Sequence, residues 1–235
     1  MAFPTFAAAP TVSSRGSNAV QDSVTLPASI AAGDLILVWH ASDITTTRTW
    51  ASPWVELLDG LDGDSTSSIG IAYLIASGGE TAVLVDKSVT ERFTALAVRI
   101  AAASWHGTTP PEVSTSATGS DTAPDPDSVT ASWGSDDNLF IAMAEYDVVG
   151  ATTVTAYPTS YADNQTEATQ IDSCGRVAIA SRELAAASDD PAAFTIDPTQ
   201  GWRAATVVVR PAAAASPVES GAGFPFQLQM TGFGT

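Results

Sequence analysis

The sequence contains little of what several functional classes require. It has one cysteine, Cys174, so no disulfide can form within the chain. It has one lysine, Lys87, and its 9 basic residues face 26 acidic ones, which gives a net charge of −17. A phosphate backbone or an anionic membrane would repel such a chain. We therefore expect no nucleic-acid partner and no membrane partner.

Long apolar runs and helical periodicity are also missing. No uncharged apolar stretch approaches the roughly 20 residues of a membrane helix. Residues 1–6 carry no basic region ahead of an apolar stretch, so we expect no signal peptide. Residues 181–187 could form a helical turn or two, but their counterpart at 76–79 could not. We expect a loop at 181–187.

Strand signals dominate what is present. Short runs rich in Val, Ile, Thr and aromatic residues alternate with Gly, Pro, Asp and Ser, about every ten residues. This pattern predicts an all-β fold, an antiparallel β-sandwich or jelly-roll-like body. The clearest expected strands are 35–39, 82–85, 95–100, 139–144 and 206–209.

The order of these segments is repeated along the chain. The run at 24–43 is echoed at 129–147, 69–75 at 176–180, and 93–100 at 202–210. We therefore predict two pseudo-repeats joined by a Pro/Thr/Ser-rich crossover, since a period of about a hundred residues is too long for a solenoid. A chance likeness between strands is the alternative, and the pattern leaves open whether the halves share one core. The expected units are 1–106, 107–128, 129–212 and a C-terminal arm at 213–235.

The arm is apolar and alternates with period 2, which is typical of a strand with one buried face. It could pack on its own domain as a last strand or be donated to a neighbouring subunit, and we favour the assembly contact. The residues predicted to bind the partner are Phe224, Phe226, Leu228, Met230 and Phe233.

Signals for catalysis are weak. His40 and His106 lie in or beside expected strands, and neither has a nucleophile motif next to it. One cysteine and two separated histidines cannot form a zinc site of the usual kind. Arg176 could lower the pKa of the Cys174 thiol, but a buried, inert cysteine is the favoured reading. We expect no enzymatic activity.

Three carboxylates on a glycine-rich segment give a candidate calcium site. Asp59, Asp62 and Asp64 offer the hard oxygen ligands that calcium prefers, although the spacing is not that of an EF-hand. The alternative is a solvated hairpin loop in which Asp and Gly supply turn geometry. We predict no other cofactor.

Two tryptophans give a candidate glycan site. Trp50 and Trp54 flank a proline and could expose flat rings to a sugar, whereas Trp39 and Trp202 lie in strand patterns and are expected in the core. The alternative for Trp50 and Trp54 is a packing corner. Tyr157–Tyr161 takes the equivalent place in the second half.

A further pattern combines strands and turns. Leu26-Pro27-Ala28-Ser29 is followed by Gly33–Val38 and Pro53–Leu58, and the halves close with Ala97–Ile100 and Val207–Pro211. Over residues 10–211 this pattern resembles accessory structural proteins of tailed bacteriophages, although the second half lacks the Pro-Trp segment.

The resemblance implies a non-enzymatic virion component, made in the host cytoplasm, that decorates the capsid or attaches to the tail. Its partners would be other virion proteins, within a homo-oligomer on a symmetric assembly. The competing hypothesis is a carbohydrate-binding adsorption module that recognises a host surface glycan.

Overall fold

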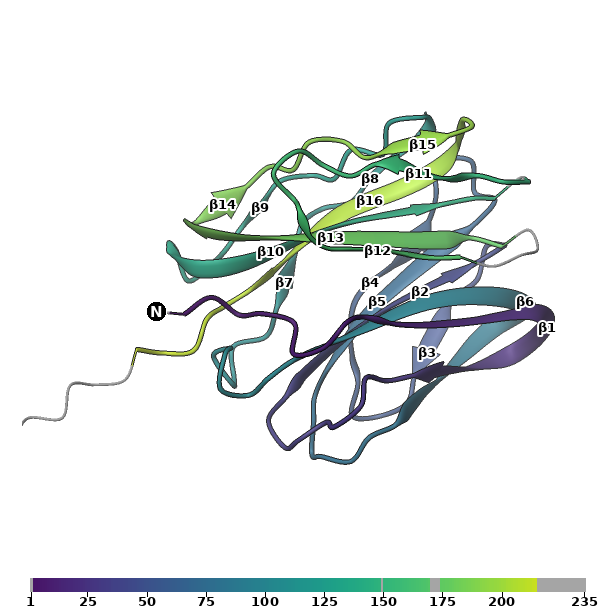
Figure 1. Cartoon of the computed structure of the whole chain (residues 1–235). Helices are drawn as coiled ribbons and strands as arrows, with labels where there is room; N and C mark the ends of the chain where they lie inside the picture. The colour runs from purple at the N-terminus through teal and green to yellow at the C-terminus, as the bar shows by residue number, and fades with distance from the viewer. Residues whose placement is uncertain (1, 149, 170–173, 215–235) are drawn as a thin grey trace, which may run out of the picture.

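The computed structural model describes residues 2–148, 150–169 and 174–214, and these residues form strands, turns and loops without a helix. Two antiparallel six-stranded sheets pack as two layers (Figure 1). The predicted all-β sandwich is confirmed, and each of the five expected strands lies within an observed one.

Each half of the chain builds one sheet. The first has the order β1 (Thr11–Thr25), β6 (Ala82–Ile100), β2 (Leu35–Ser42), β5 (Ser68–Ile75) and β4 (Val55–Leu61), with β3 (Arg48–Trp50) also on β6. The second has the order β12 (Asp163–Ala168), β13 (Arg176–Ala186), β10 (Asp136–Tyr146), β16 (Gln200–Val209) and β7 (Glu112–Val113), with β8 (Ala117–Asp121) also on β16. Two small ribbons pair β11 (Thr153–Ala156) with β15 (Thr195–Asp197), and β9 (Val129–Thr130) with β14 (Ser188–Asp189).

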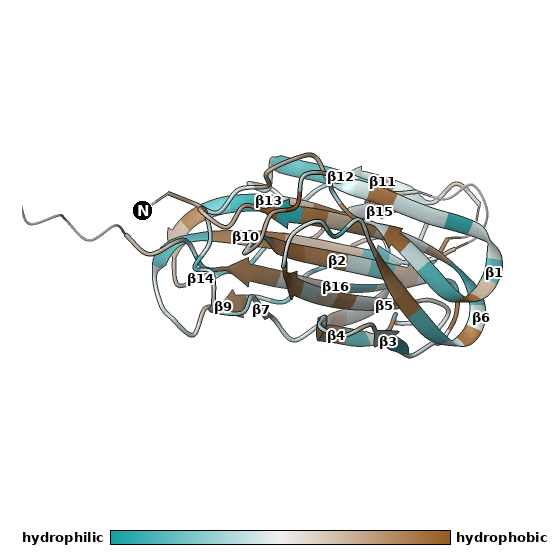
Figure 2. Ribbon diagram, turned by 90° about the horizontal axis from the view of Figure 1, so that it is seen from below, coloured by the Kyte–Doolittle hydropathy of each residue, from teal (hydrophilic) through white to brown (hydrophobic). Residues whose placement is uncertain are grey.

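The two halves share one core between the sheets. Because strand side chains alternate, Leu35, Leu37 and Trp39 of β2 face Leu139, Ile141 and Met143 of β10 within a single buried cluster. Hydrophobic colour runs along β2, β10 and β16 where the layers meet (Figure 2). The open question of one core or two is thus answered: the sheets form one sandwich.

Each sheet also buries its outer face, beneath strands of its own half. In the first sheet, the long strand β6 pairs with β2 through residues 93–100, and residues 82–87 continue between β1 and β3. Val83 and Val85 thereby cover Ile36 and Val38. In the second sheet, Phe194 and Ile196, in and beside β15, cover Phe140 and Tyr146.

The two sheets use the same strand order. In the first, Leu35 of β2 pairs with Ile100 of β6 and Ile75 of β5; in the second, Leu139 of β10 pairs with Val209 of β16 and Glu183 of β13. Taken as equivalent, β6, β2, β5 and β4 match β16, β10, β13 and β12. This order agrees with a duplication, whose origin stays a prediction.

Three sequence expectations need comment. The prediction of a loop at 181–187 was wrong, because residues 181–186 belong to β13. This stretch pairs with β10 throughout, and the pairing outweighs the helical preference of its residues. The crossover at 107–128 supplies the short strands β7 and β8 as well as a connection. The predicted arm residues Phe224, Phe226, Leu228, Met230 and Phe233 lie outside the described residues.

Candidate functional site

The Trp50–Trp54 corner lies where β3 turns into β4. Trp50 pairs with Val85 of β6, and the Trp54 amide donates a hydrogen bond to the Ala51 carbonyl at 3.1 Å. The two indole rings stack with centroids 6.1 Å apart and planes 29° apart. Both rings are partly buried against the outer cluster of the first sheet. The corner is therefore a packing corner that leaves part of each ring exposed.

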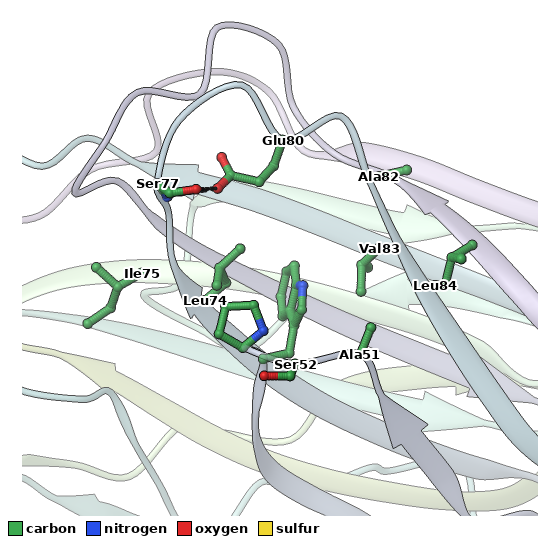
Figure 3. Close-up of a pocket in the computed structure, with 11 residues that line it drawn as sticks. Ala51, Ser52, Leu74, Ile75, Ser77, Glu80, Ala82, Val83 and Leu84 are labelled. Carbon is green, nitrogen blue, oxygen red and sulfur yellow. Dashed lines mark hydrogen bonds between the residues drawn. The ribbon is translucent and has the colours of Figure 1, made fainter.

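A pocket of about 360 Å³ opens beside Trp54, within the size range of small-ligand sites. Leu74 of β5 and Val83 of β6 lie on opposite sides of it in Figure 3, and both belong to the outer apolar cluster of the first sheet. Glu80 is its one charged lining residue, and its carboxylate accepts hydrogen bonds from Ser77 Oγ and the Ser77 amide, both at 2.7 Å. These bonds lower the pKa of Glu80. The pocket is thus apolar at its centre, with a fixed carboxylate at its rim. It is lined by Ala51, Ser52, Pro53, Trp54, Leu74, Ile75, Ser77, Glu80, Ala82, Val83 and Leu84.

The equivalent corner of the second half has one buried and one partly exposed ring, Tyr161 and Tyr157. Tyr161 is fully buried, and its hydroxyl donates to Asp189 at 2.7 Å. The Tyr157 ring packs edge-on against Phe194, with centroids 5.8 Å apart. The two corners therefore differ in their second aromatic residue, since Trp54 is partly exposed and Tyr161 is fully buried.

The three candidate calcium ligands are engaged with different protein groups. Asp59 lies in β4 rather than in a loop, and its carboxylate pairs with Arg48 at 2.7 Å. Asp62 accepts hydrogen bonds from Thr66 and Ser67, which close the hairpin between β4 and β5, while Asp64 accepts one from Ser120. Among the described residues, no group of three or more acidic, histidine or cysteine side chains is arranged to hold a metal ion. The calcium site stays a prediction.

His40 lies at the centre of a buried polar network that the sequence analysis missed. Its Nε2 is 2.8 Å from Asp22, its Nδ1 accepts a hydrogen bond from Arg48 at 3.0 Å, and its ring stacks on Phe93. Lys87 also pairs with Asp22 at 2.9 Å. Both ring nitrogens are occupied, and the ring is fully buried. Burial is the main cause that lowers the pKa of His40 to about 4, so the imidazole is neutral at pH 7.

Arg48 joins this network to the neighbouring strands. Its guanidinium donates to the Ser68 carbonyl at 2.6 Å and to Asp59, and its stem crosses Gly70. A Cβ at position 70 would lie 2.3 Å from Arg48 Cδ, so a larger residue there would displace the arginine. The network is a structural connection between β1, β2, β3, β4, β5 and β6.

The remaining titratable candidates lie apart from the pocket. The half-buried His106 accepts hydrogen bonds at Nδ1 from the Thr109 amide at 3.2 Å and lies 2.8 Å from the Thr109 hydroxyl. Cys174 is fully buried, and this burial raises the pKa of its thiol. Glu145, which the sequence analysis missed, is fully buried between the sheets, accepts a hydrogen bond from Ser67, and has its pKa raised by burial.

Comparison with known proteins gives no relative. No family model, no curated protein and no solved structure matches the chain. Among the described residues there is also no helix that is long and apolar enough to span a membrane. The candidate site therefore rests on its own geometry.

Proposed function

We propose that this chain is a non-enzymatic structural component of a tailed-phage-like virion. In this proposal it decorates the capsid or attaches to the tail, and its partners are other virion proteins. It docks through the sandwich and the arm at 213–235, as one copy of a homo-oligomer on a symmetric assembly. Support comes from a rigid two-sheet body with one shared core, and from an acidic surface that disfavours unspecific association.

One observation carries the proposal. The residues behind the phage resemblance are joined in space, because Asp34 of the Gly33-Asp34 turn pairs with Arg99 at 3.1 Å. The same carboxylate accepts hydrogen bonds from the amides of Ala31 and Ala102, each at 2.9 Å. Asp34 thus fixes the start of β2 against the end of β6. The quoted pattern corresponds to one physical unit, which favours a shared architecture over a chance likeness of strands.

The test is to find the chain on particles. Antibodies raised against the purified protein would be applied to phage particles from the source culture and visualised by gold labelling in the electron microscope. We expect gold on the capsid or on the tail. Intact particles, complete with shell and tail in the electron microscope, that bind no gold would refute the proposal.

A glycan-binding adsorption module is the second candidate, favoured by the open Trp54 pocket. A pyranose ring could stack on the exposed part of Trp54, with the Ser52 and Ser77 hydroxyls at the rim as polar partners. Such a site would bind a neutral sugar better than an anionic one, because Glu80 carries negative charge there.

This second candidate has its own test. Host polysaccharides would be titrated into the intact protein while tryptophan fluorescence is recorded. If the site binds sugar, Trp54→Ala should abolish the response and Tyr157→Ala, at the equivalent corner of the second half, should retain it. An equal response from both variants would remove the glycan hypothesis.

A further inference from the structure

Lys87 is the only lysine of the chain, and it lies buried beside Asp22. The Lys87 nitrogen is 2.9 Å from Asp22 Oδ2, and both side chains are 0% exposed. Asp22 belongs to β1 and Lys87 to β6, and these strands run side by side as an antiparallel pair (Figure 1). Removing two charges from water costs several kcal/mol per ion. A neutral bond between the same two groups would remove this cost.

Two backbone carbonyls fix the orientation of the Lys87 nitrogen. It donates hydrogen bonds to the carbonyl of Glu91 and to that of Arg92, the latter at 3.3 Å. An ammonium group has three N–H donors, so the third is the one that Lys87 shares with Asp22. Transfer of that proton to Oδ2 leaves an amine whose two N–H groups stay on the carbonyls. The lone pair of the nitrogen is then on the side of the Asp22 carboxyl group.

Two further side chains hold the carboxyl group of Asp22. Arg15 donates to Oδ1, and a guanidinium in this position stabilises negative charge on that oxygen. His40 Nε2 lies 2.8 Å from Oδ2. Because Arg48 donates to Nδ1 of the same ring, the neutral imidazole carries its proton on Nε2 and donates it to Oδ2. Each carboxyl oxygen therefore has its own donor.

The resting state of the pair is ionic, and its surroundings favour a neutral one. Burial raises the pKa of Asp22, but the hydrogen bonds from His40 and Lys87 outweigh this effect and lower it. Burial also lowers the pKa of Lys87, which favours the amine. Phe93 stacks on His40, and Val85 is the registered partner of Asp22, both within the outer apolar cluster. Proton transfer inside the pair thus gives the reactive amine and carboxylic acid without solvent.

We propose that Lys87 and Asp22 condense to an intramolecular isopeptide bond that joins β1 to β6. Lys87 Nζ attacks Asp22 Cγ, and the N–Cγ bond forms as negative charge moves to Oδ1, next to Arg15. The Cγ–Oδ2 bond then breaks, and Oδ2 leaves as water with two of the three protons that the ammonium carried. The third proton stays on the amide nitrogen. One positive and one negative charge disappear together, so the net charge is unchanged and no other reactant is needed.

The bond would secure the outer layer of the first sheet. β1 is an edge strand, with β6 as its only partner within the sheet of the described residues. A covalent link between β1 and β6 restricts the unfolded chain in the way that a disulfide does, in a sequence that has a single cysteine. The inference goes beyond the virion proposal, because the reaction takes place within one chain and needs no particle.

Amine labelling of the denatured, full-length wild-type protein tests the bond. In guanidinium chloride with an acetylating reagent, a chain without the bond takes one label on its terminal amine and one on Lys87, its only lysine. We expect label on the terminal amine alone, and an intact mass that is lower by one water. Proteolysis should release a branched peptide that contains both Asp22 and Lys87, identified by tandem mass spectrometry.

Two controls separate this bond from other losses of water. Asp59-Gly60 and Asp62-Gly63 could lose water as succinimides. A succinimide leaves Lys87 free to take the label and is opened by hydroxylamine, whereas an isopeptide bond resists hydroxylamine. Lys87→Arg is the matched variant, because it keeps a positive charge beside Asp22 but removes the amine, so its chain should have the full mass.

The role of Arg15 is tested by the rate of bond formation. The protein would be made by cell-free synthesis, quenched in denaturant at intervals and labelled as before. Arg15→Gln should slow the loss of Lys87 labelling by roughly 100-fold, since it removes the donor to Oδ1. Arg182→Gln is the matched control, because it breaks a comparable ion pair with Asp189 in the second half and should leave the rate unchanged. Equal rates for both variants would remove Arg15 from the reaction.

Two outcomes would overturn the proposal. A wild-type chain of full mass with label on both amines would leave the Lys87–Asp22 pair as an ordinary buried ion pair. A loss of water that persists in Lys87→Arg would place the reaction elsewhere in the chain. Neither outcome affects gold labelling of particles, so this proposal and the virion proposal fail separately.

Discussion

The two halves use the same strand order but cover their outer faces differently. In the first half, the far part of the paired strands β1 and β6 closes over β2 and buries charges, with Asp22, His40, Arg48 and Lys87 each less than 9% exposed. In the second half, an aromatic cluster centred on Phe194 covers the outer face of the sheet.

The residues at equivalent positions explain the difference. By the strand pairing, His40 corresponds to Ala144, so the second half has no buried imidazole to satisfy. The layer of the second half is mainly aromatic, and its one buried charge among the described residues, Arg176, lies 3.5 Å from Glu167 at the edge of the sheet. The half with the charged layer is also the one with the pocket beside Trp54. The following predictions test this contrast.

Asp22→Ala should have the largest effect. Asp22 pairs with His40 and Lys87 at 2.8 and 2.9 Å and also with Arg15. Its removal leaves a buried lysine without its carboxylate, so we expect the free energy of unfolding to fall by about 3–5 kcal/mol. The measurement is urea denaturation followed by circular dichroism. The control is Asp86→Ala on the neighbouring strand β6, an exposed position where the loss should stay within about 0.5 kcal/mol. Similar losses for both would mean that the charged layer is not a source of stability.

The second largest effect should be a difference in stability loss between substitutions at the two aromatic corners. Tyr161→Ala removes a fully buried ring and its bond to Asp189, so we expect a loss of about 3–4 kcal/mol. Trp54→Ala removes a partly exposed ring and should cost about 1–2 kcal/mol. The same denaturation experiment measures both. A greater cost for Trp54 than for Tyr161 would show that the open corner is a stability element rather than a binding surface.

Acid should weaken the first half through His40. The native pKa of about 4 lies below the ordinary value of 6.5, so the unfolded chain takes up a proton first as the pH falls. Stability is complete above pH 6.5 and is lost toward pH 4, by about 2 kcal/mol between pH 7 and pH 4.5. Burial raises the pKa of Glu145 and that of Asp43, the latter to about 6, and these groups act in the opposite direction.

The contribution of His40 is therefore measured as a difference. Unfolding free energies would be compared between the wild type and His40→Gln at both pH values, so that the carboxyl contributions cancel. The wild type should lose about 2 kcal/mol more than the variant on acidification. Parallel pH dependences would rule out a buried neutral imidazole.

The sequence predicted the sandwich because its central strands are apolar on both faces. Runs such as Leu35–Trp39 and Leu139–Ala144 are covered on each side, by the other sheet and by their own outer layer. Hydrophobicity alone therefore located them. The strand at 181–186 was not predicted, because its residues favour helices. It is extended only because it pairs with β10, which is distant in the sequence.

The charged network was harder to foresee because its members are far apart in the chain. A signal was nevertheless present: Asp22 is in phase with Val24, His40 with Val38, and Lys87 with Val85, at alternating strand positions. Three charged or polar groups in phase with buried valines indicate a shared buried site. The pattern could not predict that β1 and β6 fold over the outer face of β2, since that arrangement depends on the irregular pairing between β1 and β6.

The smallest contrast concerns one ion pair from each half, although the two pairs are not at equivalent positions. By the strand pairing, Arg99 corresponds to Val208 rather than to Arg210. Arg99 and Asp34 are 3.1 Å apart with side chains 16% and 3% exposed, whereas Arg210 and Asp136 are 3.4 Å apart and 30% and 18% exposed. Arg99→Gln should therefore cost about 1 kcal/mol, and Arg210→Gln about 0.5 kcal/mol or less. Denaturation at low salt and in 1 M sodium chloride measures both, because salt screens the more exposed pair more strongly. Equal costs that respond equally to salt would mean that the Asp34–Arg99 pair contributes no more to stability than a more exposed surface pair, and the unit behind the phage resemblance would lose its physical basis.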